Sequence, residues 1–425
     1  MIKNIHFFRL LSISDFRNFW FVQVFTLFAM QFYFLSLSWL TIDLTDSTMV
    51  LGILLTFAAV PRLILVPIGG VLFDRLNPKK LLIANMSILV ISTIIFTIIL
   101  FLMPVQTWML ILFAIFFGIA SALFLPTSFA LIPKLVPEEY LQSANSFSQL
   151  SMQLSNTFGP AIAGILISLY GVPSVYGTMS IFFIISLTFS FFLKNIQSNI
   201  NLGKYEKKIT IRSLFSDIVS GLKIIKKSQL LLMLIIISSL LNLSIVGPQQ
   251  IGLPYIANQI PNSGAENLGF LMSSLGLGNL IGVVIIGFFK NNKSKGIITM
   301  LLTITLGILW SFVGFFPNHL YITAVFLFVS GICIGMLNVL VITLIQMHSP
   351  VDATGRVMSL QLLGSTGIQP ITFLIVGWSL ELISPALLFL FSGIILATTA
   401  IVSLCFKSIR ESDGKNEKQS EVASY

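Results

Sequence analysis

One basic side chain lies inside a long apolar stretch of the 425-residue sequence. Arg62 follows Pro61 in the run from Ala59 to Ile64. A guanidinium group stays charged in proteins and presents five N–H donors in a planar fork that matches carboxylate and phosphate groups. No Asp or Glu lies at a similar depth in another apolar stretch, so an ion-pair partner is missing. Arg62 is therefore a candidate for binding an anion. Hydrogen bonds to backbone carbonyls freed near Pro61, and to polar side chains, are the alternative.

Amide side chains occur inside several other apolar stretches. In the stretch near residues 141–169, four of them share one face of a helix: Asn145, Gln149, Gln153 and Asn156. A polar face on an otherwise apolar helix is expected to face the protein interior or a water-filled cavity. The amides near the middle of their stretches are candidates for binding a substrate, and interhelical hydrogen bonding is the alternative. These candidates are Gln31, Gln153, Gln249 and Gln369.

Acidic residues are rare, and none lies in the middle of an apolar stretch. A carboxyl group whose pKa is raised by burial can take up and release a proton. The candidate proton carriers are Asp43, Asp74 and Glu381, which lie near the ends of apolar stretches. The two cysteines, Cys333 and Cys405, are far apart, and neither a cluster of His, Asp and Cys nor a nucleotide-binding loop occurs. We therefore expect no metal, no other cofactor and no enzyme activity.

The elements that must position these residues are apolar segments of about 20 residues, the length of helix that spans a bilayer. Hydrophobic residues make up 56% of the chain and charged residues 9%, which is too little charge to cover a soluble protein. The alternating segments of a membrane β-barrel are absent. We predict an all-α integral membrane protein with twelve transmembrane helices, near residues 18–42, 48–72, 80–103, 106–131, 141–169, 173–194, 228–256, 267–289, 296–316, 319–346, 355–381 and 385–406.

The distribution of basic residues predicts the orientation. With the N-terminus in the cytoplasm, every Lys and Arg except Arg62 falls on the cytoplasmic side. We therefore expect a multi-pass protein of the cell membrane with both termini in the cytoplasm. The net charge of +9 then reflects orientation and contact with lipid, and not nucleic acid binding. The expected partners are the bilayer and a small-molecule substrate, and we expect a monomer.

The longest polar stretch divides the chain into two halves. We predict a six-helix half over residues 1–194, a cytoplasmic linker over 195–227 with an amphipathic helix, a second six-helix half over 228–407, and a disordered tail over 408–425. Leu51 to Lys80 matches Leu268 to Ile297 at an offset of 217 without gaps. A second match pairs Pro137 with Pro350. These matches predict parallel repeats, with the substrate near the midplane between them.

The predicted loop between the second and third spans carries a specific pattern, Gly70-Val71-Leu72-Phe73-Asp74-Arg75-Leu76-Asn77-Pro78-Lys79-Lys80. It resembles the G-x-L-x-D-R-x-G-R-K loop of the major facilitator superfamily, with Asn77 and Pro78 in place of the later Gly and Arg. Gly70 lets two helices approach closely, and Asp74 can pair with a basic group at the cytoplasmic rim. We therefore expect Gly70, Asp74 and Arg75 to belong to a gate.

Two further patterns resemble exporters of the same superfamily. The run Ser155-Asn156-Thr157-Phe158-Gly159-Pro160-Ala161-Ile162-Ala163-Gly164 is similar to the antiporter motif G-x-x-x-G-P-x-x-G-G, and Gly159 and Pro160 are its gating residues. Pro160 is expected to bend its helix. The run from Leu131 to Ser146 is similar to the connection between the fourth and fifth spans in the macrolide-efflux and siderophore-exporter branch.

These resemblances imply the major facilitator fold and alternating access. They also imply proton-driven export of a small amphipathic compound, such as a siderophore or a drug-like molecule. Arg62 favours an anionic compound. The alternative is a facilitator-type importer of a small nutrient.

Overall fold

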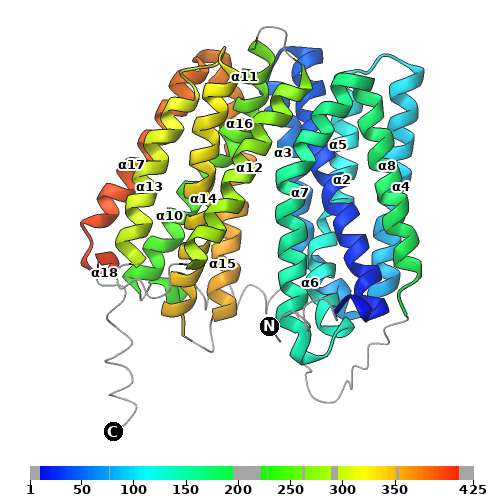
Figure 1. The fold of residues 1–425 in the computed structure, drawn as a ribbon, viewed down its shortest axis with the longest axis horizontal. Helices are drawn as coiled ribbons and strands as arrows, with labels where there is room; N and C mark the ends of the chain where they lie inside the picture. The colour runs from blue at the N-terminus through cyan, green and yellow to red at the C-terminus, as the bar shows by residue number, and fades with distance from the viewer. Residues whose placement is uncertain are drawn as a thin grey trace. The chain divides into compact units, whose positions relative to one another are not determined.

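The computed structural model describes residues 10–75, 77–194, 222–226, 228–260, 264–288, 295–350 and 354–410. Within these ranges the secondary structure is helical throughout and contains no strand. Each of the twelve predicted spans falls on one helix or on two or three consecutive helical elements (Figure 1). The prediction of an all-α protein is confirmed for these residues.

The first six spans are formed by seven helices. They are α2 (Ser14–Thr45), α3 (Thr48–Arg75), α4 (Pro78–Leu102), α5 (Thr107–Ala122), α6 (Phe124–Leu135), α7 (Leu141–Tyr170) and α8 (Val172–Phe191). Short 3-10 turns, η1 (Leu10–Ser12) and η2 (Glu138–Tyr140), precede α2 and α7. The fourth span is interrupted at Leu123, between α5 and α6.

The second six spans include two interrupted ones. They consist of α10 (Gln229–Gly247), the π-helix η3 (Pro248–Gly252), α11 (Leu253–Gln259), α12 (Ala265–Phe288), α13 (Lys295–Val313), α14 (Leu320–His348), α15 (Thr354–Thr366), α16 (Gln369–Leu382) and α17 (Pro385–Leu404). A short helix, α18 (Lys407–Arg410), follows. The amphipathic helix that we predict in the linker, over residues 211–222, lies outside the described residues, apart from Leu222.

Ten helices in the described part of the chain are long and apolar enough to cross a membrane. α5 is apolar but short, and α7 is long but is not among the ten. The amides on one face of α7 account for its lower hydropathy. Outward-facing side chains support a membrane location. From Ile88 to Phe101 in α4 the exposed side chains are spaced by three or four residues and are all apolar, namely Ile88, Ile91, Ile95, Ile98 and Phe101.

The chain forms two compact units. The first comprises Met1–Glu206 and Asn262–Ser273, and the second comprises Lys207–Pro261 and Ser274–Tyr425. The start of α12, up to Ser273, therefore belongs to the first unit and the rest of the helix to the second.

The same helix pairs pack together inside each unit. In the first, α8 packs on α2 and α4, α7 packs on α2, and α5 packs on α3. In the second, α17 packs on α10 and α13, and α15 packs on α10. Each pair in the second unit joins the spans that correspond, six positions later, to a pair in the first. The packing therefore repeats the duplication that the sequence predicts.

Two glycines make the duplication visible at atomic detail. A Cβ atom on Gly118 would clash with the carbonyl oxygen of Ala58, and a Cβ atom on Gly331 would clash with that of Leu275. Ala58 and Leu275 are separated by 217 residues, and Gly118 and Gly331 by 213. Glycine lets the backbones of two membrane helices approach closely. The same close crossing, between the second and fourth spans of each half, therefore occurs in both units.

Candidate functional site

Arg62 lies within α3 and is half-buried. Among the described residues, its guanidinium makes no hydrogen bond and no ion pair. The backbone carbonyls near Pro61 therefore do not satisfy it, and the alternative role raised by the sequence has no support here. A charged side chain at mid-membrane depth costs about 2.5–3.5 kcal/mol on insertion scales. Its five donors are available to an anion.

Three side-chain hydrogen bonds connect α2 with α7, and one of them reaches the row of amides on α7. Trp20 Nε1 donates to Ser151 Oγ at 2.8 Å, and Ser148 Oγ donates to Gln23 Oε1 at 2.9 Å. Farther along the helices, Gln31 Nε2 donates to Asn156 Oδ1. Interhelical hydrogen bonding, the alternative raised for Gln31, is thus realised.

Most of the amides on this face of α7 are exposed. Asn145, Gln149 and Asn156 are exposed, and Gln153 is half-buried. An amide group in contact with lipid tails would lose its hydrogen bonds to water, so an exposed row of amides inside a membrane must line an aqueous space. This face of α7 is therefore suited to contact a polar substrate.

The small residues of α7 are sites of close helix contact. A Cβ atom on Gly159 would lie 2.6 Å from Cβ of Gln31 in α2. A second helix that contacts α7 closely is the first part of α12, which belongs to the same compact unit. A Cβ atom on Gly164 would lie 2.6 Å from the carbonyl oxygen of Ala265, and one on Gly269 would lie 2.6 Å from that of Pro160. Side chains larger than hydrogen cannot be accommodated without separating the helices.

The predicted gate residues Gly70, Asp74 and Arg75 form the end of α3, and their side chains lie outside the described part of the structure. The neighbouring residues explain the departure from the family pattern. The Asn77 side chain caps α4 by accepting hydrogen bonds from the backbone N–H groups of Lys79 (3.0 Å) and Lys80 (3.4 Å). Pro78 occupies the first helical position, where proline is favoured. Asn77 and Pro78 thus form a helix start.

Lys79 has a role that the sequence does not reveal. Its Nζ donates to the carbonyl oxygen of Phe191 at 2.8 Å and also to that of Leu193. Phe191 is the last residue of α8 and Leu193 lies just beyond it, so both carbonyl groups are at the end of the helix where its dipole favours a cation. Asp15 assists by accepting a hydrogen bond from the backbone N–H of Lys194 at 3.0 Å. Lys79 therefore joins the loop motif to the end of α8.

In the second unit, the predicted binding residues lie where helices are interrupted. Gln249 lies in the π-helix η3, and Gln369 is the first residue of α16, directly after the break that separates it from α15. Both are half-buried, and neither makes a hydrogen bond within the described residues. Other amides of this unit act as interhelical or local links: Gln361 Nε2 donates to Ser238 Oγ at 2.9 Å.

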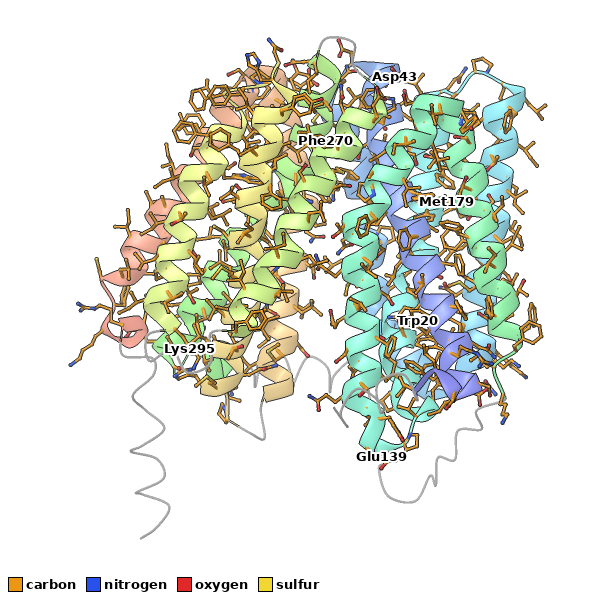
Figure 2. The ribbon with its side chains drawn as sticks, viewed as in Figure 1. Trp20, Asp43, Glu139, Met179, Phe270 and Lys295 are labelled. Carbon is orange, nitrogen blue, oxygen red and sulfur yellow. The ribbon has the colours of Figure 1, made fainter. Side chains whose placement is uncertain are left out.

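The candidate proton carriers lie at helix ends. Asp43 is exposed near the end of α2, at the opposite end of that helix from Trp20 (Figure 2). Glu381 is exposed near the end of α16. Glu266, one residue before the predicted span at 267–289, belongs to the first turn of α12. One of its carboxylate oxygens is buried and has no hydrogen bond among the described residues. No cluster of His, Cys, Asp and Glu that could hold a metal occurs within the described residues.

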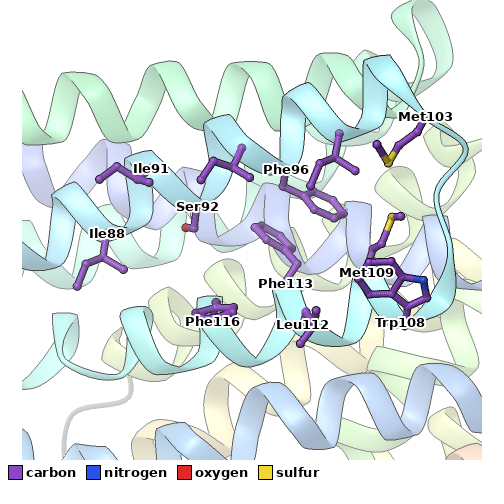
Figure 3. A pocket seen from close by; sticks show the side chains of 12 residues that line it. Ile88, Ile91, Ser92, Phe96, Met103, Trp108, Met109, Leu112, Phe113 and Phe116 are labelled. Atoms are coloured by element: carbon purple, nitrogen blue, oxygen red, sulfur yellow. The ribbon is translucent and has the colours of Figure 1, made fainter.

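A groove of about 630 Å³ lies between α4 and α5 (Figure 3). Its walls include Ile91, Phe96, Leu112 and Phe113, and Trp108 lies at one end. Trp108 Nε1 donates to Gln106 Oε1, which satisfies the indole without a ligand. The groove contains none of the predicted substrate-binding side chains, so it is not the candidate site.

Comparison with known proteins places this geometry in context. The family model of the Major Facilitator Superfamily matches residues 19–360 and 237–424. Macrolide efflux protein A of Streptococcus pyogenes is 24% identical over 373 residues, which cover 87% of this chain and 90% of that protein. The enterobactin exporter EntS of Escherichia coli O1:K1 / APEC is 23% identical over 317 residues, which cover 75% of this chain and 73% of that protein.

Solved structures share the fold at low sequence identity. A mutant of the nucleoside transporter NupG superposes with a TM-score of 0.72 at 13% identity, over 92% of this chain and 99% of that one. A D-xylose-proton symporter superposes with a TM-score of 0.67 at 12% identity, over 96% of this chain and 99% of that one.

Proposed function

Because the chain belongs to the major facilitator superfamily, we propose that this membrane transporter is a secondary active exporter of a small amphipathic organic compound. The fold supports alternating access, in which the two six-helix repeats expose one binding site to either side in turn. The glycine-rich part of α7 resembles the antiporter motif, and its Gly164 contacts α12 closely. Relatives over most of the chain are exporters of a macrolide and of enterobactin.

The proposed class of substrate rests on Arg62. It is the one basic residue away from the ends of the predicted spans, and it makes no hydrogen bond or ion pair among the described residues. An unpaired guanidinium favours a carboxylate or another planar anion, which it can bind through two parallel hydrogen bonds. It disfavours a cation by like-charge repulsion. We therefore propose an anionic compound, for example a carboxylate siderophore, as the substrate.

The amides Gln31, Gln153, Gln249 and Gln369 are proposed to complete the binding site. Amides supply both donors and acceptors without adding charge. Gln249 and Gln369 suit this role because neither is hydrogen-bonded within the described residues. Gln31 can contribute through its side-chain oxygen or its second N–H while its bond to Asn156 is kept, or with the whole amide if that bond opens.

We propose protons as the coupling ion. Asp43, Asp74 and Glu381 are the candidate carriers, since none of the predicted spans has an acidic residue in its middle. Each lies near a helix end, so the proton would be exchanged at the membrane surfaces. The protein is further proposed to function as a monomer in the cell membrane, with both termini in the cytoplasm, as the positive-inside rule predicts.

Comparing the culture medium of cells that have and lack the gene tests the direction of transport. Export predicts that an anionic compound accumulates in the medium of the producing cells and falls when the gene is deleted. Restoring the gene should restore the compound. If the deletion instead abolishes uptake of a compound from the medium, and leaves the exported compounds unchanged, the protein is an importer.

A further inference from the structure

The seventh span contains a π-helix that the sequence periodicity does not predict. Between α10 and α11, residues Pro248–Gly252 widen the turn, and the backbone N–H of Leu253 donates to the carbonyl oxygen of Pro248. Proline has no N–H, so the usual bond to the preceding turn is missing at this point. Single π-helical turns inside α-helices occur frequently at functional sites.

Close contacts on both sides fix the orientation of this turn. A Cβ atom on Gly247 would lie 2.5 Å from the Thr372 methyl group and 2.7 Å from a Val376 methyl group, both in α16. A Cβ atom on Gly252 would lie 3.0 Å from the Phe389 ring in α17. Since the backbone is held against a neighbouring helix at each end of the turn, the backbone between them has little freedom to move. The directions in which its side chains leave the helix are therefore fixed.

Gln250, in the middle of this turn, has an unused hydrogen-bond acceptor. Its Oε1 is buried and has no hydrogen-bond partner among the described residues. Two other amides of this unit are hydrogen-bonded: Asn242 Nδ2 donates to the carbonyl oxygen of Ser238, and Gln361 Nε2 donates to Ser238 Oγ. A buried acceptor without a donor destabilises the protein unless a ligand or an ordered water supplies one.

We propose that Gln250 is a substrate-binding residue of the second unit, whose side-chain oxygen accepts a hydrogen bond from an O–H or N–H group of the transported compound. This inference rests on the proposed function. The π-helix presents an acceptor for a neutral donor group, whereas Arg62 in α3 presents donors for an anionic group.

Transport into inside-out membrane vesicles tests the role of the acceptor. Enterobactin and a macrolide, both rich in hydroxyl groups, serve separately as probes. Gln250→Leu should raise the KM of the transported probe by roughly 3- to 10-fold, the loss of one hydrogen bond, with little change in the maximal rate. Gln250→Glu, which keeps an acceptor, should retain more affinity than Gln250→Leu. Gln361→Leu is the matched control, because it removes a satisfied amide and should leave the KM unchanged.

Thiol labelling decides the inference even if the wild type transports neither probe, a result that would contradict only the proposed substrate class. In a variant whose Cys333 and Cys405 are replaced by alanine, Gln250→Cys should react with a water-soluble methanethiosulfonate reagent. Ile251→Cys, at the neighbouring buried position, should not react. An unreactive Gln250→Cys overturns the inference. A KM for Gln250→Leu equal to that of the wild type also overturns it, because the side-chain oxygen of Gln250 would then accept hydrogen bonds from water and not from the substrate.

Discussion

Gly164 of α7 lies so close to Ala265 of α12 that a Cβ atom on the glycine would be 2.6 Å from the alanine carbonyl oxygen and 3.1 Å from Cα of Glu266. The contact is between two backbones, so a rotamer change cannot relieve a clash there. One turn earlier, the Pro160 carbonyl oxygen faces Gly269 in the same way. The two crossings hold the last part of α7 against the first part of α12. We expect these two contacts between α7 and α12 to form and break during transport.

Gly164→Val should therefore abolish most transport while leaving the amount of protein in the membrane near normal. The added side chain forces the two helices apart and biases the protein towards states without this contact. Gly177→Val is the matched control, because a Cβ atom at Gly177 meets no atom closer than 4.0 Å. Transport rates divided by the amount of inserted protein give the comparison. A Gly164→Val variant with the wild-type rate would show that the contact is not used.

Pro160→Ala should slow the exchange between inward-open and outward-open states. Proline inside α7 leaves one backbone carbonyl without its helical hydrogen bond and favours a bend, whereas alanine restores the bond and straightens the helix. Cysteines introduced at the exposed positions Asn145 and Gln149 can be labelled from either side of the membrane to monitor the exchange. Unchanged labelling together with unchanged transport would mean that Pro160 is only a tolerated break.

Asp74→Asn should reduce transport strongly without affecting expression or insertion. The substitution keeps the shape of the side chain but removes the charge that we expect to hold the cytoplasmic gate. Asp46→Asn is a suitable control, since Asp46 is exposed and lies in the left-handed backbone conformation that asparagine also adopts readily. The gate hypothesis fails if the two variants transport equally well.

Lys79→Gln should lower the thermal stability of the purified protein. It removes the ammonium group that caps the carbonyls of Phe191 and Leu193, a contribution of about 0.5–2 kcal/mol. Lys80→Gln should have little effect, because that side chain is exposed. Melting temperatures in detergent separate the two variants. Equal melting temperatures would exclude a capping role for Lys79.

The spans and their order could be predicted because membrane helices are specified by long apolar segments, a strong and local signal. The start of α4 at Asn77 and Pro78 could also be predicted, since a capping side chain followed by proline is a local signal for the start of a helix. The capping of α8 by Lys79 could not be predicted, because the two segments are more than a hundred residues apart in sequence. The π-helix at Pro248–Gly252 shifts hydrogen bonding by one residue, which barely changes the apolar pattern.

The candidate site was predictable only as a set of polar residues in apolar surroundings. Gln31 and Gln249 look alike in the sequence, but Gln31 is bonded to Asn156 whereas Gln249 has no partner among the described residues. That distinction depends on which helix lies opposite each amide. Arg62 was the clearest signal, because a lone charge in an apolar segment is costly wherever its helix packs.

The export of an anionic compound through Arg62 is the central claim, and transport by Arg62 variants tests it most directly. The measurement is the rate at which inside-out vesicles take up the compound that accumulates in the medium of producing cells, for the wild type, Arg62→Lys and Arg62→Gln at equal protein levels. We predict that the compound is an anion, that Arg62→Gln abolishes its transport, and that Arg62→Lys restores it only in part, because an ammonium group lacks the planar fork. Normal transport by Arg62→Gln, or a cationic compound, would contradict the claim.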